Sequence, residues 1–379
     1  MTGTGPAQRP ESAGRLGQRG TDGSLPSRLS GPSRPYAASD AYGAPARAGT
    51  SRVRHRRRRQ PARVPPEFGE AVGAATRRLL ALDHERGAEA AVPLAAGALH
   101  GVREQWRRLA PQRPLPGGDT GAALAELAEV AGWILFDAER QRQAYRLNRQ
   151  ALALAARTGD RWTQRLVLSH LSMQAAHLGL PRASFRIAQS VLDSGPLPAR
   201  VEALFTIRQS RALALAGRRH EAVAAIRRAR GLFADGVSAR DPHWAWWMDE
   251  HELNGHRGIT HARLGDRDTA AVLLRAAVDG PQDQPPAYRA LFRTELLSVL
   301  VGAGAWREAE EVAARLVPDA GELGSMRAVR MIDAAVGRLL WLPRVPPSLQ
   351  DTAHCLGAAL PDRPWRYGPR PGGGPNRRT

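Results

Sequence analysis

The sequence predicts an all-α protein in which antiparallel helix pairs stack one after another as a solenoid. Three observations predict this fold. The central part of the chain is rich in Ala, Leu and Arg and poor in Ile, Thr and Tyr, a bias that favours helices over strands. A short pattern of Gly and a small residue recurs along it. Between the recurrences, apolar residues follow helical spacing, as at Leu168, Leu171, Ala175 and Leu178.

The recurring pattern marks the turn between two paired helices. A turn residue, usually Gly, is followed five residues later by a small residue, which we call the anchor. Gly accepts the positive φ of a tight turn, and a small anchor lets two helices approach closely. In the first unit a Glu replaces the Gly. The turn and anchor residues are Glu139 and Ala144, Gly179 and Ser184, Gly217 and Ala222, Gly265 and Ala270, and Gly304 and Ala309.

Two further positions keep the same register. The residue twelve positions before the anchor is small in four of the five units, and the residue seven positions after it is apolar in all five. One helix pair cannot bury its apolar faces alone, whereas stacked pairs can. The earlier positions are Gly132, Ser172, Ser210, Gly258 and Leu297, and the later ones are Ala151, Val191, Ala229, Ala277 and Leu316.

Helical spacing extends beyond the five units on both sides. Residues 67–86 and 89–110 have the pattern of a further pair around Gly87. Residues 326–340 form an amphipathic helix, which we expect to cap the stack. We therefore predict a single helical repeat domain over residues 67–342.

The two ends of the chain differ from this domain in composition. Residues 1–66 and 343–379 are rich in Gly, Pro and Arg and lack hydrophobic periodicity. Such segments bury too little apolar surface to offset the entropy lost on ordering. We therefore predict that both are disordered basic tails.

The register of the units resembles the tetratricopeptide repeat, which also has a small residue in its first helix, Gly at the turn and Ala in its second helix. Trp306 fits the turn-side aromatic residue of that family. The anchors lie 38–48 residues apart, against a family period of 34 residues. The resemblance implies a tetratricopeptide-like superhelix.

Three stretches have a narrower resemblance. Residues 82–87, 126–133 and 242–247 are similar to the C-terminal halves of actinomycete regulators, in which an Xre-type helix-turn-helix precedes a tetratricopeptide-like region. The likeness covers roughly residues 67–340. It implies a sensor or dimerisation module that acts in transcriptional regulation.

The DNA-reading domain of those regulators has no counterpart in this sequence. An Arg-rich tail takes its place, without the paired short helices that would seat a recognition helix in the major groove. We therefore expect no sequence-specific DNA binding by this chain alone. Two explanations stay open: the chain lacks the domain naturally, or its start is misplaced.

The net charge of +19 lies mainly in the predicted tails. Residues 1–66 contribute +10 and residues 343–379 contribute +4, whereas residues 67–342 contribute only +5. The densest basic run in the first tail could neutralise phosphates, or it could be a solvated linker. It has no interleaved aromatic residue for base stacking, so we expect only non-specific contact with nucleic acid, and through the tail alone. The residues in question are Arg56, Arg57, Arg58 and Arg59.

The family resemblance also implies a ligand groove. In tetratricopeptide arrays the first helices line the concave face. A mixture of charges beside Trp and Met suits a bound peptide, although the same residues could belong to the core or to solvated surface. In the family register the groove-facing residues are Glu129, Trp133, Met173, His177, Arg211 and Glu252.

Two other motifs are candidates for binding. Trp244, Trp246 and Trp247 lie in the longest segment between units, where they could pack between helix pairs or contact a ligand. His251 and His256 flank a Glu as in zinc proteases, but they are five residues apart instead of four and so do not share a helical face. We predict a helix-surface pair of Glu252 with His256 and no metal site.

The sequence gives no indication of catalysis. No nucleophile elbow, phosphate-binding loop or dinucleotide fingerprint is present, so we predict that the chain is not an enzyme and needs no cofactor. Cys355 is the only cysteine, which rules out an intrachain disulfide. No apolar run approaches 18 residues, so we expect a cytoplasmic protein without membrane contact.

These observations favour a regulatory module. Its helical array would bind a protein, a peptide or a second copy of the chain as a homodimer, and it would act on transcription through that partner. A first alternative is a DNA-associated regulator whose Arg-rich tail contacts nucleic acid non-specifically. A second is a small-molecule sensor that uses the Trp-rich segment as a lid.

Overall fold

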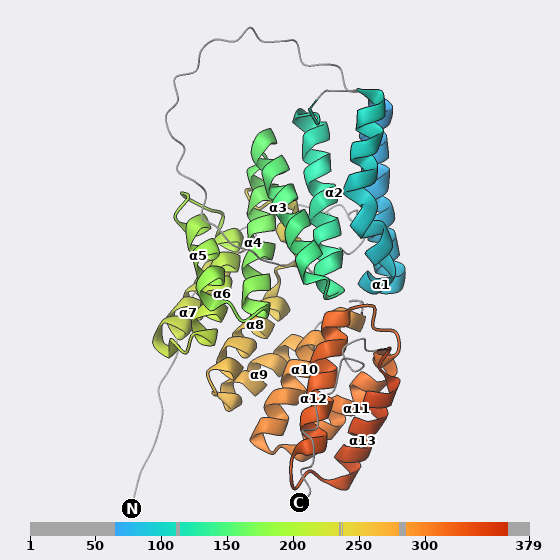
Figure 1. The fold of residues 1–379 in the computed structure, drawn as a ribbon. Helices are drawn as coiled ribbons and strands as arrows, with labels where there is room; N and C mark the ends of the chain where they lie inside the picture. The colour runs from blue at the N-terminus through green and yellow to red at the C-terminus, as the bar shows by residue number, and fades with distance from the viewer. Residues whose placement is uncertain (1–64, 111–113, 235, 237, 280–285, 363–379) are drawn as a thin grey trace, which may run out of the picture. The chain divides into compact units, whose positions relative to one another are not determined.

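A computed structural model describes residues 65–110, 114–234, 236, 238–279 and 286–362 (Figure 1). These residues form 13 α-helices and one 3-10 helix, and no strand occurs among them. The predicted all-α class is therefore confirmed for this part of the chain. All the described residues belong to one compact unit within Arg34–Thr379. Most of the predicted N-terminal tail lies outside them.

The first helix, α1 (Pro66–Leu109), consists of two helical segments that meet at Gly87. Gly87 has φ 78° and ψ 172°, far from helical values, so the chain reverses there. Phe68 in the first segment packs against Trp106 in the second, with ring centroids 5.0 Å apart. The predicted leading pair around Gly87 is thus confirmed.

Ten helices follow as five pairs, each joined by a tight turn (Figure 1). The five predicted turn residues all have positive φ, between 60° and 78°. Glu139 is the exception to Gly, with φ 60°. Each helix contacts the next along the chain, both within and between pairs. The pairs are α2 (Gly118–Asp137) with α3 (Gln141–Thr158), α4 (Arg161–His177) with α5 (Pro181–Leu192), α6 (Ala199–Leu215) with α7 (Arg219–Ala234), α8 (Glu250–Arg263) with α9 (Arg267–Val278), and α10 (Pro286–Ala303) with α11 (Trp306–Ala320). The 3-10 helix η1 (His243–Trp247) precedes α8.

Small residues hold the two helices of each pair together. All five anchors are completely buried. Ser172 and Ser210 each donate a hydrogen bond of 2.9 Å from Oγ to the carbonyl oxygen of the anchor in their own pair, Ser184 and Ala222. A Cβ atom at Gly258 would lie 2.6 Å from Leu274 Cγ, so no larger residue fits there. The predicted register is therefore the register of helix contact.

The hydrophobic core passes from pair to pair. One cluster of buried residues runs from α1 to α4, a second from α4 to α8 and a third from α8 to α11 and the helices beyond it. Leu166 and Val167, neighbours on α4, belong to different clusters, as do Leu253 and Ile259 on α8. Each of these helices is therefore shared between adjacent parts of the core.

Two helices complete the described chain, α12 (Met326–Trp341) and α13 (Pro347–Ala359). The prediction of a disordered tail from residue 343 is wrong for α13. Pro347 occupies the first turn, where a helix tolerates proline, so it begins a helix instead of preventing one. Leu349, Ala353 and Leu356 are completely buried, and α13 packs on α11 and α12. The helix α12 is therefore not the last layer.

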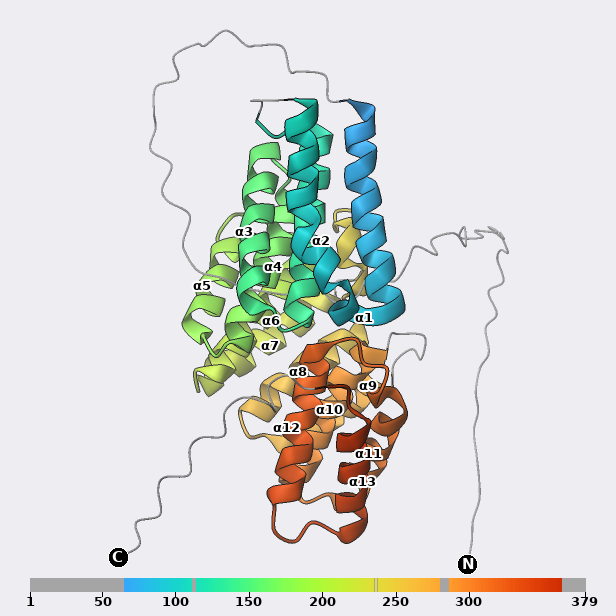
Figure 2. The same cartoon turned by 45° about the vertical axis from the view of Figure 1, so that its right-hand side comes forward.

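The start of α12 lies beside the ends of α1 and α2, as Figures 1 and 2 both show. The backbone N–H of Glu89 donates a hydrogen bond of 3.1 Å to the carbonyl oxygen of Gly324, just before α12. A Cβ atom at Gly87 would lie 2.1 Å from Gly324 Cα. The early and late helix pairs therefore meet backbone against backbone.

Candidate functional site

The six residues predicted to line the groove all lie on first helices of their pairs. They come from α2, α4, α6 and α8. Four of them, however, are almost completely buried: Glu129 and Trp133 are each 4% exposed, and Met173 and Glu252 each 1%. His177 and Arg211 are half-buried. The expectation that all six are open to a ligand is thus not met in this structure.

A column of polar residues connects four of these first helices on the inside of the array. Glu129 Oε1 of α2 lies 3.4 Å from His170 Nδ1 of α4. On the other side of the column, Arg208 Nη1 of α6 lies 3.4 Å from His256 Nε2 of α8. His256 Nε2 is also 2.9 Å from Glu252 Oε1. We call these five residues the inner column.

The repeat register explains the column. His170, Arg208 and His256 each lie two positions before the small residue of their own helix, so equivalent positions of successive pairs face one another. Sequence reasoning did not single out His170 as a site residue, and it missed Arg208. The predicted pairing of Glu252 with His256 is confirmed, but the pair is buried in the column and not on the surface.

The charges of the column are unusual for a protein interior. Burial holds the pKa of His170 well below its ordinary value of 6.5, and the charge of Arg208 acts in the same direction. Burial also lowers the pKa of His256, against the opposing influence of Glu252. Both imidazoles are therefore neutral at pH 7, and Arg208, which cannot lose its proton in a protein, carries the positive charge.

Arg208 is the largest completely buried side chain of the described residues, with 1% of its surface exposed. Its Nη1 reaches His256, but its Nε and Nη2 have no hydrogen-bond partner in the part of the chain that the structure describes. A buried donor without an acceptor costs roughly 1–3 kcal/mol, and more when it is charged. The site therefore has a strong physical demand for an anionic or carbonyl acceptor.

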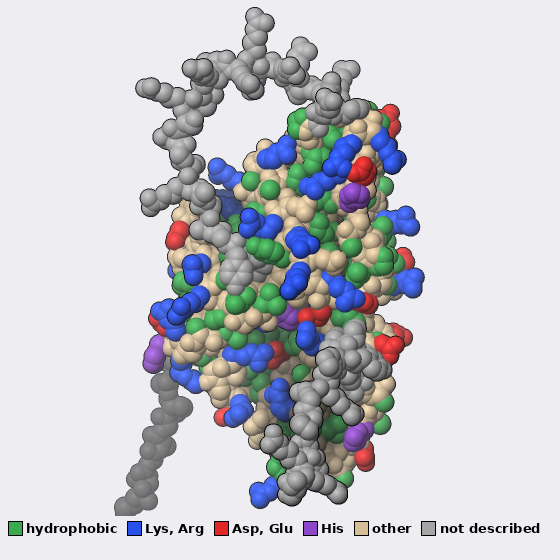
Figure 3. Space-filling model, viewed as in Figure 1, with side chains coloured by type: hydrophobic (Ala, Val, Ile, Leu, Met, Phe, Trp, Pro, Cys, Tyr) green, Lys and Arg blue, Asp and Glu red, His purple; other side chains and the backbone are tan. Residues whose placement is uncertain are grey.

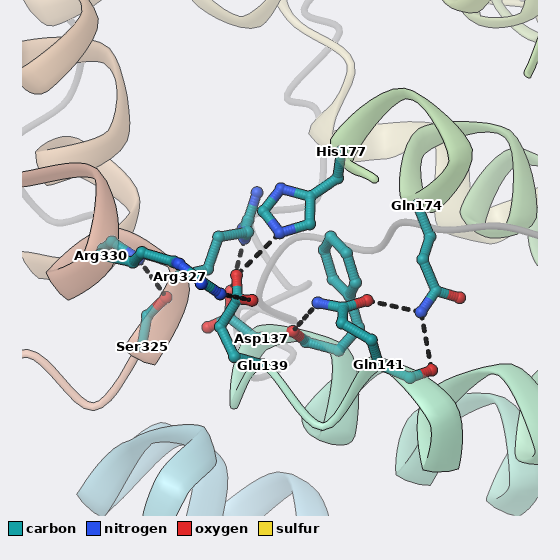
Figure 4. A network of polar contacts seen from close by, with 10 residues as sticks. Asp137, Glu139, Gln141, Gln174, His177, Ser325, Arg327 and Arg330 are labelled. Atoms are coloured by element: carbon teal, nitrogen blue, oxygen red, sulfur yellow. Dashed lines mark hydrogen bonds and ion pairs between the residues drawn. The ribbon is translucent and has the colours of Figure 1, made fainter. Parts of the chain in front are cut away.

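A second set of charges connects α2 and its turn with α12 (Figure 4). Arg327 donates from Nε to Asp137 Oδ1 at 2.9 Å. Arg330 Nη1 and His177 Nε2 lie 2.9 Å and 2.8 Å from the two carboxylate oxygens of Glu139. We call these five residues the clasp, because they join residues about 190 positions apart.

Aromatic rings connect the clasp with the inner column. The guanidinium of Arg327 lies over Trp133 and Phe136, at 5.5 Å and 5.1 Å from their ring centroids. Trp133 in turn packs against His170, with centroids 6.3 Å apart. The predicted groove residue Trp133 thus lies between the two polar sets.

Two carboxyl groups near the clasp titrate abnormally. Burial raises the pKa of Asp83 on α1 from 3.8 to about 7, and the charge of Asp137 raises it further in the same direction. Burial also opposes ionisation of Glu139, but His177 and Arg330 outweigh it and lower its pKa. The clasp therefore stabilises the ionised form of Glu139 and disfavours that of Asp83.

The tryptophan segment serves packing. Trp244 is 3% exposed and belongs to the same buried cluster as Val201 and Leu204 of α6. Trp247 is half-buried against two of the clusters. The side chain of Trp246 and the run from Arg56 to Arg59 lie outside what the structure describes. The packing interpretation is confirmed for Trp244.

Searches for other kinds of site are negative within the described residues. No helix there is long and apolar enough to cross a membrane, and no group of three or more His, Cys, Asp or Glu is placed to hold a metal ion. Comparison of the sequence with protein-family models and with curated proteins finds no match. The functional argument therefore rests on the residues of this chain.

Proposed function

We propose that the chain is a tetratricopeptide-like solenoid that binds a segment of another polypeptide, or of a second copy of itself, along its inner column. The observation that carries this proposal is the buried guanidinium of Arg208, whose Nε and Nη2 have no acceptor among the described residues. A carboxylate matches this need, because it accepts two parallel hydrogen bonds from a guanidinium.

The surroundings of Arg208 suit a peptide better than a free ion. His170 and His256 supply neutral hydrogen-bonding groups on either side of it, and Trp133 and Met173 supply apolar surface on α2 and α4. The equivalent positions recur in successive pairs, so an extended segment can be contacted by several of them. The passage of the core from pair to pair supports the solenoid arrangement.

Binding at Arg208 is coupled to opening of the array. Because Arg208 is buried in the present structure, a ligand reaches it only when first helices separate. The clasp joins α2 to α12 and opposes that separation. In this proposal the ligand shifts the population from the closed to the open arrangement.

The role in transcription rests on the resemblance of residues 82–87, 126–133 and 242–247 to actinomycete Xre-type regulators. The partner would carry the DNA-reading function. The liganded array would then alter the activity of that partner.

Photocrosslinking in the native cell tests the binding proposal. A benzophenone amino acid replaces Arg211, which is half-buried on α6, or, as the control, Val272, which is 63% exposed on α9. We expect one defined polypeptide adduct, or a dimer of the chain, at position 211 and not at 272. We also expect Arg208→Gln to remove the adduct while the thermal unfolding transition stays cooperative. Equal adducts at both positions, or none at 211, would refute the proposal.

Transcript profiling tests the regulatory part separately. Deletion of the coding sequence should change a defined set of transcripts, which the unmodified chain restores and the Arg208→Gln chain does not. If the transcripts are unchanged although the crosslink forms, the regulatory role is wrong and the binding proposal stands.

A further inference from the structure

The folded part of the chain is nearly balanced in charge only on average. Residues 141–230 contain 16 Arg and four acidic residues, a net charge of +12. Residues 67–140 carry −3 and residues 231–342 carry −4. The excess positive charge is thus concentrated in α3 to α7, and the overall value of +5 conceals it.

The second helices of three pairs present this charge in rows. Counted from the anchor, the position two residues before it is Arg142 on α3 and Arg182 on α5, and the position two residues after it is Arg146 and Arg186. Arg227 on α7 occupies the position five residues after its anchor, as Arg149 does on α3. Because equivalent positions of stacked pairs lie on one face, these arginines share the outer surface. We call them the outer arginines.

The outer arginines are exposed. Within the described residues, no ion pair involves Arg142, Arg146, Arg182, Arg186 or Arg227, and α3 and α5 contain no acidic residue. Figure 3 shows Arg side chains spread over the helices on this side with few acidic ones between them. The surface is therefore positively charged without internal compensation.

The later pairs lack these rows. On α9 the positions two before and two after the anchor are Asp268 and Val272. On α11 they are Arg307 and Glu311, which lie 3.5 Å apart as an ion pair. The same fold thus carries a basic outer face on α3, α5 and α7 and a neutral one on α9 and α11.

We propose that the outer arginines form a docking surface for the phosphate backbone of duplex nucleic acid. This surface is separate from the inner column, so the inference goes beyond the function proposed above. From Arg142 to Arg149 the helix rises about 10 Å, a length over which a duplex presents about six phosphates. Guanidinium groups bind phosphate in bidentate geometry.

Other anionic partners fit this surface less well. None of the large exposed hydrophobic residues of the described chain lies on α3, α5 or α7, so the surface has no apolar wedge for a membrane. The aromatic ring beside it, Tyr145, is half-buried and accepts a hydrogen bond of 3.4 Å from Arg149. Without an exposed ring for base stacking, the surface favours the backbone of a duplex over a single strand.

Fluorescence anisotropy of a labelled 20-base-pair DNA duplex of arbitrary sequence, titrated with the full-length protein between 50 and 200 mM NaCl, tests this proposal. The test variant changes Arg142, Arg146, Arg182 and Arg186 to Ala. The matched control changes four exposed arginines of the later helices, Arg267, Arg307, Arg315 and Arg338, to Ala. Both variants lose the same charge and keep both ends of the chain, so binding by the N-terminal basic run is identical in the two.

We expect the test variant to bind at least roughly tenfold more weakly at 100 mM NaCl, with a salt dependence less steep by up to about 3.6 log units per decade, and the control to stay within about twofold. Changing the same four residues to Lys should retain most of the affinity, because the charge remains. Circular dichroism verifies that each variant unfolds cooperatively.

Three results would overturn the proposal. The first is an equal loss of affinity in test and control variants. The second is tighter binding of a 20-nucleotide single strand than of the duplex. The third is that the test variant loses binding to vesicles with 30% anionic lipid but keeps its affinity for DNA.

Discussion

The junctions inside helix pairs and the contacts between distant pairs are built from different kinds of residue. At the junctions, small residues such as Gly258 and Ser210 let helices meet at short range, and the partner is about 12 residues away. In the inner column and the clasp, charged residues meet across 48 positions, as Arg208 and His256 do, or 190, as Arg327 and Asp137 do. Shape therefore builds each pair, and charge connects pairs that are remote in sequence.

The largest expected effect concerns the pH dependence of the charged region. The pKa of Asp83 is raised to about 7 in the folded chain, against an ordinary value of 3.8. Its ionisation therefore opposes folding, and the associated stability is present below pH 4 and lost as pH rises through about 7. The loss is up to about 4 kcal/mol. We expect Asp83→Asn to flatten the profile of unfolding free energy between pH 4 and 9, measured by urea denaturation; parallel profiles for the two proteins would contradict this.

The second effect separates a buried cation of the clasp from an exposed one. Arg327→Ala should lower the unfolding free energy by about 3 kcal/mol, because it leaves Asp137 in a largely buried place without its 2.9 Å ion pair. Arg330→Ala should cost about 1 kcal/mol or less, because Arg330 is 55% exposed. Urea denaturation at pH 7 measures both. Equal effects would mean that burial does not decide the strength of the clasp.

The smallest effect tests the junctions with one chemical change at two sites. Gly258→Ala should destabilise the protein by about 1–3 kcal/mol, because its Cβ would lie 2.6 Å from Leu274 Cγ. Gly337→Ala, in the interior of α12 with no other atom within 4 Å of its Cβ, should stabilise it by up to about 1 kcal/mol. Opposite shifts in Tm are expected by differential scanning calorimetry. Shifts of the same sign would remove close packing as the basis of the junction.

This difference also sets what the sequence can reveal. The turn residues, the anchors and the break at Gly87 were predictable, because they depend on short-range spacing and on the conformational freedom of Gly. The helix α13 was missed, because Pro346 and Pro347 were interpreted as the start of a tail although proline is tolerated in a first helical turn.

Long-range features escape such reasoning for another reason. Periodicity shows which face of a helix is apolar, but it does not show that Arg327 meets Asp137, since nothing local relates the two. The predicted groove residues were assigned to the correct helices by the repeat register, yet the burial of Glu129 and Trp133 depends on neighbours distant in sequence. The basic outer face was overlooked because charge was summed over residues 67–342 and not along the register.

The close contact of Gly87 with Gly324 restricts how this chain can change its length. An open stack of repeats can gain or lose a unit, because each unit touches only its neighbours. Here a Cβ atom on either glycine would lie about 2 Å from the backbone of the other, so the fit tolerates almost no displacement. Duplication or deletion of one helix pair would move these glycines apart by the thickness of two helices and break the contact. The number of repeats is therefore fixed by the meeting of the two ends.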